Sequence, residues 1–229
     1  SVAPSYNTLL HSSNYENYNW DNEFDNSATN SISLNLILSN ILDLDIDLIS
    51  VKKHVQFEKL IDDNSPGINN YSIIPVQYFD NLEVLKIKLA RKIKFGKFSI
   101  DSKLLLQKTM SDNFINLPEI VSRNTFYYST DMFNKALYLQ TGFGVKYFSK
   151  FYMNGYDPLL SELYVQSDKE IGEFPLIDFF INAKIQQTRL YFKFEHFNSS
   201  FTGYNYYSAP NYPYRDFTFR FGLVWNFFM

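Results

Sequence analysis

Charged side chains recur at every second position in several segments of the chain. Asp43, Asp45 and Asp47 form one such run, and Lys86 and Lys88 form another. So many charges would be prohibitively costly in a dry core, so this spacing predicts a wet wall. If that wall encloses a passage, opposed charges across it would bias ion selectivity. In the second half of the chain, the candidate wall residues are Lys146, Asp178, Lys184, Arg189, Lys193, Glu195, Asp216 and Arg220.

Catalytic and metal-binding chemistry find little support in the residues. The histidines His11, His54 and His196 are scattered, the chain has no cysteine, and no Gly-x-Ser-x-Gly motif occurs. The acidic run at 43–47 could bind a cation, but three carboxylates in line lack the looping geometry of a calcium site. We therefore predict no enzyme, no catalytic residue, no cofactor and no metal ion. His196 is expected to follow the outward parity of its strand.

The elements that would carry these charges are long amphipathic strands. In residues 214–229, Phe217, Phe219, Phe221, Leu223 and Trp225 share one face, and mostly polar residues share the other. Side chains alternate across a strand with period two, so we predict one strand spanning this whole segment. A soluble sheet could bury its aromatic face against a second sheet, whereas a transmembrane barrel would turn it to lipid.

The predicted turns between strands alternate between short and long. Short turns are expected near 39–41, 95–97, 131–135 and 186–187, and long connections near 51–80, 108–117, 149–173 and 199–214. Transmembrane barrels show this asymmetry, whereas a Greek-key sandwich has no reason to show it. The fold class we predict is all-β: a transmembrane antiparallel meander β-barrel, or the C-terminal portion of a larger one. The segment 51–76 is expected to be a loop.

Composition agrees with a barrel. Aromatic residues make up 19% of 229 residues, yet the mean hydropathy is −0.24. No run approaches the roughly 18 apolar residues of a membrane helix. With 21 basic and 24 acidic residues, no global field favours nucleic acid, and we predict no nucleic-acid partner. Two short strands within 5–25 would bring the count to about eleven, an odd number that favours a chain beginning partway round a larger barrel. Ser1 is then a processed end or the start of a fragment.

Four stretches carry a resemblance to a known family. They are LPEIVSRNTFYYS at 117–129, LQTGFGVKYFSKFY at 139–152, the segment 156–185, and FEHFNSSFTGYNYYSAPNYPYRDFTFRFGLVWNFF at 194–228. They resemble the C-terminal part of the putative porin family of Bacteroidetes outer membranes. The resemblance implies a location and an architecture more than a substrate, and family members are longer upstream. Residues 1–229 are accordingly expected to be one outer-membrane barrel domain, the C-terminal part of a longer barrel.

The last strand also resembles the C-terminal signal of bacterial outer-membrane proteins. The matching residues are Arg220, Gly222, Trp225 and Phe227. The resemblance implies that the barrel-assembly machinery recognises this strand.

The leading functional hypothesis is an outer-membrane porin-like channel for passive diffusion of small hydrophilic solutes. A barrel without conductance, serving as a subunit of a larger outer-membrane assembly, is the alternative. A soluble all-β binding module would need the aromatic face of the last strand to be buried. The expected partners are outer-membrane lipid, the assembly machinery and other outer-membrane proteins, and the expected location is the bacterial cell outer membrane.

Overall fold

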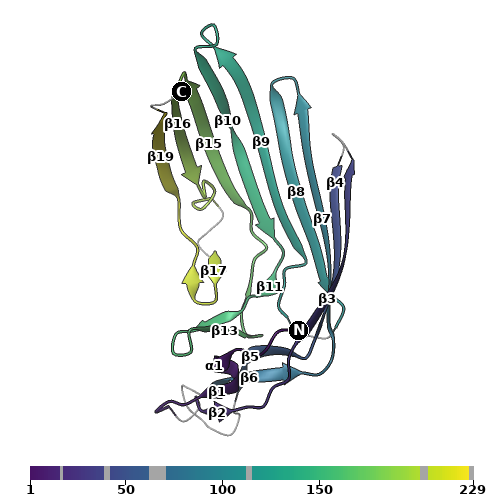
Figure 1. The fold of residues 1–229 in the computed structure, drawn as a ribbon. Coiled ribbons are helices and arrows are strands. Elements are labelled where there is room, and N and C mark those ends of the chain that lie inside the picture. Colours follow the sequence, from purple (N-terminus) through teal and green to yellow (C-terminus); the bar gives the residue numbers. More distant parts are fainter. Residues whose placement is uncertain (16–17, 39–41, 62–70, 112–114, 202–205, 227–229) are drawn as a thin grey trace.

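The computed structural model describes residues 1–15, 18–38, 42–61, 71–111, 115–201 and 206–226. Its main element is a nine-stranded antiparallel sheet with the order β19-β16-β15-β10-β9-β8-β7-β4-β3 (Figure 1). The predicted all-β antiparallel meander is confirmed. Within the described residues β3 and β19 do not pair with each other, so the sheet is open. Its strands are β3 (Ala28–Leu38), β4 (Leu42–Lys52), β7 (Leu82–Phe95), β8 (Phe98–Thr109), β9 (Ile120–Met132), β10 (Leu137–Phe148), β15 (Leu176–Ile185), β16 (Thr188–Glu195) and β19 (Thr218–Trp225).

A row of phenylalanines fixes the register of the last four strands. Phe143 lies opposite Phe179, Phe179 opposite Phe194, and Phe194 opposite Phe219. Successive ring centroids are 5.1, 5.8 and 5.0 Å apart, within the range of favourable aromatic pairs. A slip of one residue would turn every side chain of a strand to the other face. The contacts between these phenylalanines therefore favour the observed register over a shifted one.

The register divides the sheet into a polar face and an apolar face. We call the face that carries Asp45, Lys88 and Asp178 the polar face, and the face of the phenylalanine row the apolar face. The apolar face carries a polar patch at β8 and β9: the Ser102 hydroxyl donates to Asn124 Oδ1 at 2.5 Å, and Asn124 Nδ2 donates to the Ser122 hydroxyl at 2.8 Å. This patch explains why the two faces of β9 are hard to separate by sequence alone.

The short turns and the long connections lie at opposite ends of the sheet. Gly96 makes the turn between β7 and β8 with φ of +59°, a conformation that glycine adopts without steric cost because it has no Cβ. Gln186 and Gln187 join β15 to β16. The predicted turn near 39–41 lies outside the described residues. At the other end the connections fold into structure of their own. They include the short pairs β11 (Phe151–Tyr152) with β14 (Glu170–Ile171) and β17 (Tyr207–Ala209) with β18 (Tyr212–Pro213).

A second sheet, the cap, lies at this end of the main sheet (Figure 1). It has the order β12-β13-β5-β6, and β13 pairs with β5 in parallel. Trp20 of β2 packs against its core, Asn7 of α1 donates to Glu162 of β13, and β1 pairs with β2, so these three elements are counted as part of the cap. The cap elements are α1 (Tyr6–Leu9), β1 (Leu10–His11), β2 (Trp20–Asp21), β5 (His54–Ile61), β6 (Tyr71–Tyr78), β12 (Gly155–Asp157) and β13 (Glu162–Val165).

The predicted loop at 51–76 is wrong, because β5 and β6 occupy much of it. Their buried residues Phe57 and Ile73 pack with Leu160 from the β12–β13 turn and with Trp20 from the N-terminal segment. These partners lie far away in the chain, so burial holds the strands where local alternation is weak. The expected pair of short strands within 5–25 is present as β1 and β2, with the helical turn α1 before them. They form a separate two-stranded sheet, so the expected count of about eleven is wrong and the main sheet has nine strands among the described residues.

The predicted strand over 214–229 is too long, since β19 covers only Thr218–Trp225. Residues before it bond to the turn that follows β16. The Phe217 N–H donates to the Ser199 hydroxyl at 3.2 Å, and the Arg215 carbonyl accepts a hydrogen bond from the His196 ring at 2.6 Å. These bonds draw residues 215–217 away from the ladder. Residues 227–229 lie outside the described residues.

No helix in the described part of the chain is long and apolar enough to cross a membrane.

Two glycines on the polar face of β10 differ in the space around them. A Cβ at Gly142 would overlap the Phe126 carbonyl oxygen and the Tyr127 backbone, whereas at Gly144 the nearest atom is Asp178 Cβ at 4.0 Å. We predict that Gly142→Ala lowers the unfolding free energy by about 1–3 kcal/mol through overpacking, and that the matched control Gly144→Ala leaves it nearly unchanged. Urea titrations in lipid vesicles would measure both, and equal midpoints would contradict the close approach of β9 and β10.

Candidate functional site

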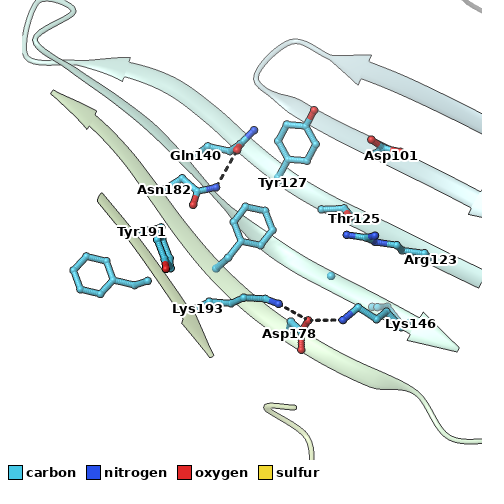
Figure 2. Close-up of a pocket in the computed structure, with 14 residues that line it drawn as sticks. Asp101, Arg123, Thr125, Tyr127, Gln140, Lys146, Asp178, Asn182, Tyr191 and Lys193 are labelled. Atoms are coloured by element: carbon cyan, nitrogen blue, oxygen red, sulfur yellow. Dashed lines mark hydrogen bonds and ion pairs between the residues drawn. The ribbon is translucent and has the colours of Figure 1, made fainter. Parts of the chain in front are cut away.

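A concavity of about 420 Å³ lies on the polar face over five strands, from β8 to β16 (Figure 2). Amide, phenol and charged groups surround it. Asn182 Nδ2 donates to Gln140 Oε1 at 3.2 Å across β10 and β15. The side chains that line it are Asp101, Arg123, Thr125, Tyr127, Gln140, Lys146, Asp178, Phe180, Asn182, Tyr191 and Lys193.

Asp178 is the centre of an ion-pair network at the cap end of this concavity. Lys146 from β10 and Lys193 from β16 approach its Oδ2 atom at 3.2 and 3.1 Å (Figure 2). The backbone N–H of His196 donates to the other carboxylate oxygen at 3.1 Å. The Asp178 side chain is only 8% exposed, so these three donors replace the water that it loses.

Glu195 extends the network towards the last strand. Lys193 Nζ lies 2.9 Å from Glu195 Oε1, so this lysine bridges the two carboxylates. Arg220 Nε and Arg215 Nη2 lie 3.0 and 3.5 Å from the Oε2 atom. Four cations therefore surround two carboxylates, which leaves the network with an excess of positive charge.

His196 anchors the chain that follows β16. It is 2% exposed, adopts φ of +51°, and stacks edge-on against Tyr206 and Tyr214 at centroid distances of 4.7 and 5.4 Å. The expectation that His196 follows the outward parity of its strand is wrong, because β16 ends at Glu195 and the backbone turns there. The side chain of Asn198 also holds this turn in place, because its Oδ1 atom accepts a hydrogen bond from the Ile177 N–H at 2.9 Å.

The structure brings together five of the eight candidate wall residues in the network: Lys146, Asp178, Lys193, Glu195 and Arg220. Lys184 and Arg189 lie opposite each other on the same face, near the short turn between β15 and β16. Asp216 lies before β19 and lines a small cavity of about 30 Å³ beside the network.

The sequence reasoning missed several residues of the site. Arg123, Tyr127 and Tyr191 line the concavity, and Arg215 joins the ion pairs. Arg123 lies directly opposite Lys146 on the neighbouring strand, so aligning the two strands in sequence could have placed it on the same face. The Tyr191 ring occupies the space where Gly222 of β19 would carry a Cβ, so it lies against that strand.

Opposite charges of the polar face also meet between β4 and β7. The acidic run of β4 lies beside the basic run of β7, and Lys88 Nζ approaches Asp45 Oδ2 at 3.4 Å. Among the described residues no group of three His, Cys, Asp or Glu side chains is arranged to hold a metal ion.

The cap contains two tyrosines that are held neutral. Burial, and then a hydrogen bond to Glu58, raise the pKa of Tyr78 from 10.0 to about 12. Burial and a 2.8 Å hydrogen bond to Asp157 likewise raise the pKa of Tyr18. Each phenol joins one segment of the cap to another, so the cap needs both protons.

The fold and the site together define a class of protein: an antiparallel meander sheet with one charged face and one exposed apolar face, the surface pattern of a membrane β-barrel wall. The family model described as "Putative porin" matches residues 1–229, so the chain belongs to that family. This confirms the resemblance seen in the sequence, while the Bacteroidetes origin stays a prediction. No curated protein and no solved structure matches the chain.

Removing the charge of Asp178 should destabilise the wall. Asp178→Asn leaves Lys146 and Lys193 facing each other without their shared carboxylate, and we expect a loss of about 1–3 kcal/mol in unfolding free energy. Asp101→Asn, on β8 at the other side of the same concavity, is the matched control and should cost much less. Urea unfolding in vesicles measures both, and equal losses would argue against a structural role for the network.

The cap should weaken in alkaline solution. Because folding raises the Tyr78 pKa, its stabilising contribution is complete below pH 10 and is lost as the pH rises towards 12. We expect the urea midpoint of the cap, followed by Trp20 fluorescence, to fall less between about pH 9 and about pH 11 in Tyr78→Phe than in the unaltered protein. Tyr156→Phe, on an exposed side chain of β12, is the control. An equal fall in all three proteins would contradict this assignment.

Proposed function

We propose that this protein is a channel of the bacterial outer membrane through which small hydrophilic solutes diffuse passively. The nine-stranded sheet would be part of the barrel wall, with the polar face towards a water-filled lumen. The observation that carries the proposal is that nine strands in continuous register separate a largely polar face from a largely apolar one.

The apolar face has the properties of a lipid-facing surface. Phe126 and Phe143, in the middle of the sheet, are 45% and 47% exposed, and Phe221 on β19 is 71% exposed. Soluble monomers rarely leave contiguous apolar surface of this extent uncovered. The long strands also have the required length: β7 to β10 contain 12–14 residues, and about 9–11 tilted residues span the hydrocarbon core.

The polar face is suited to hydrated ions and polar solutes because its charges are mixed. Salt bridges such as Lys88 with Asp45 leave hydrated charges of both signs along the wall. The network around Asp178 and Glu195 adds an excess of positive charge near the cap, where it would attract anions.

A second candidate function is a barrel without conductance that serves as a subunit of a larger outer-membrane assembly. The observation that favours it is the cap, which joins connections from three parts of the chain at one end of the sheet. A cap seated over the lumen would close it, and its outer surface would then serve contacts with other outer-membrane proteins.

The C-terminal strand supports a proposal about assembly. β19 is an open edge strand, with Arg220 and Gly222 on the polar face and Trp225 on the apolar face. Such an edge offers backbone groups for pairing with another strand. We propose that the barrel-assembly machinery recognises it. Phe227, the last residue of the expected signal, lies outside the described residues.

Conductance in planar bilayers tests the channel directly. For the purified full-length protein we expect stable ohmic steps, and Lys193→Glu or Arg189→Glu should shift the reversal potential towards cation selectivity by reversing a wall charge. Phe192→Leu, on the apolar face of the same strand, is the matched control and should leave selectivity unchanged. A protein that inserts and stays silent would favour the non-conducting subunit.

The orientation of the faces is tested by arginine substitution. Phe221→Arg would place a charge in the hydrocarbon and should cost about 2–4 kcal/mol near the bilayer midplane. Thr218→Arg, on the polar face of the same strand beside Glu195, should cost much less. Folding titrations into lipid vesicles measure both variants. Equal costs would mean that the two faces are not divided between lipid and water, and a protein stable without detergent would favour a soluble module.

A further inference from the structure

Three positively charged side chains form a row across three strands at the cap end of the polar face. Lys103 of β8 lies directly opposite Arg123 of β9, and Arg123 lies directly opposite Lys146 of β10. Like charges that face each other directly on neighbouring strands destabilise a sheet. Folding alone therefore gives no reason for this row. Residues that oppose the stability of a fold in this way are expected at functional sites.

Two of these cations have no carboxylate partner in the described part of the chain. Lys146 approaches Asp178 at 3.2 Å, whereas no ion pair there involves Lys103 or Arg123. Asp101 of the same concavity lies directly opposite a lysine of β7. Two unpaired cations match the charge of about −1.5 to −2 that a phosphate ester carries at neutral pH. A guanidinium group also binds phosphate oxygens through two parallel hydrogen bonds.

Neutral hydrogen-bonding groups lie at the other end of the concavity (Figure 2). Asn182 Nδ2 donates to Gln140 Oε1, and no other hydrogen bond of these two amides is found among the described residues. The pair therefore retains donor capacity on Gln140 and acceptor capacity on Asn182. A sugar hydroxyl can use both, because it donates one hydrogen bond and accepts others. These amides are suited to a hydroxylated solute.

An aromatic ring lies between the two ends of the concavity. Phe180 lines it, and in the register of β10 and β15 it lies opposite Gly142, between the positions of Gln140 and Lys146. The face of an aromatic ring carries partial negative charge and attracts polarised C–H groups. One face of a sugar ring presents such groups, so Phe180 offers a surface for the body of a sugar.

The space between the two ends fits a solute with two rings. Gly144 carries no side chain there, and a Cβ on it would meet its nearest neighbour, Asp178 Cβ, only at 4.0 Å. The volume of about 420 Å³ lies in the range of small-molecule sites. Lys146 and Gln140 are six positions apart on β10, which corresponds to about 20 Å along a strand. Their side chains shorten this span, so two sugar rings and a terminal phosphate match its length better than one ring does.

We propose that this concavity binds phosphorylated disaccharides, with the phosphate held by Arg123 and Lys103 and one sugar ring against Phe180. The inference rests on the proposed channel function in one respect, since the polar face must be open to solutes. It deepens that function by naming a class of solute.

Equilibrium binding to the full-length protein in detergent micelles tests the proposal without any measurement of conductance. The probe is trehalose 6-phosphate, and titrations followed by saturation-transfer NMR give its dissociation constant. Unphosphorylated trehalose should bind at least about tenfold more weakly, because it lacks the charge-assisted hydrogen bonds to Arg123. Glucose 6-phosphate, which has one ring, should also bind more weakly. Equal affinity for trehalose would overturn the phosphate contact, and equal affinity for glucose 6-phosphate would overturn the two-ring fit.

Substitution of Arg123 separates a binding role from a structural one. Arg123→Gln should weaken binding of trehalose 6-phosphate about tenfold and leave binding of trehalose unchanged. Because it removes a like-charge contact, its urea midpoint in lipid vesicles should not fall. Lys86→Gln, on the polar face of β7 outside the concavity, is the matched control for a lost positive charge and should leave binding unchanged. If Arg123→Gln does not fold, Lys103→Gln tests the same row.

Two results would overturn the site. One is unaltered binding in folded Arg123→Gln, and the other is an equal loss of binding in Lys86→Gln, which would indicate only a general effect of charge. The proposed channel is judged separately. A protein that binds trehalose 6-phosphate and does not conduct would support the site and contradict the channel, whereas a conducting protein without this binding would contradict the site alone.

Discussion

Continuous antiparallel register is the constraint on which the other features of this protein depend. Residues directly opposite each other on neighbouring strands share a face, so one continuous register decides on which face of the main sheet the charges and aromatic rings of its strands lie. The phenylalanine row from Phe143 to Phe219 makes any slip costly, because a slip would turn phenylalanines among the lysines and carboxylates of the polar face. Gly142 adds a local requirement, since only glycine permits the close approach of β10 to the backbone of β9.

The ion-pair network has a structural role as well as an electrostatic one. Asp178 receives two lysines from neighbouring strands and a backbone N–H from His196, so one carboxylate joins three strands and the turn after β16. Glu195 then connects that turn to β19 through Arg220. Because these contacts fix the turn after β16, they also fix the positions of the charged side chains in the network. An excess of positive charge is thereby held at the cap end of the polar face.

The cap shows how separate connections become one unit. β5 and β13 come from different connections of the main sheet and pair in parallel, while Trp20 of the N-terminal segment packs on Phe57 at a centroid distance of 6.0 Å. Each piece alone would be too short to bury a core. Joined, they enclose Phe57, Ile73 and Leu160, and hydrogen bonds such as Tyr18 to Asp157 tie the N-terminal segment to the β12–β13 turn. The cap therefore depends on contacts between all three segments.

The nine strands of the main sheet were predictable from the sequence, and so was the division of faces in all of them except β9, because period-two alternation is a local property of each strand. It placed Lys146, Asp178, Lys193 and Arg220 on one wall before any contact was known. Only the tertiary structure decided which of these charges meet, since partners such as Arg215 and the His196 backbone lie in turns that alternation does not describe. Tertiary contacts also decided the elements with weak local patterns. β5 and β6 exist because distant residues bury Phe57 and Ile73, and β19 begins at Thr218 because His196 and Ser199 bind the residues before it.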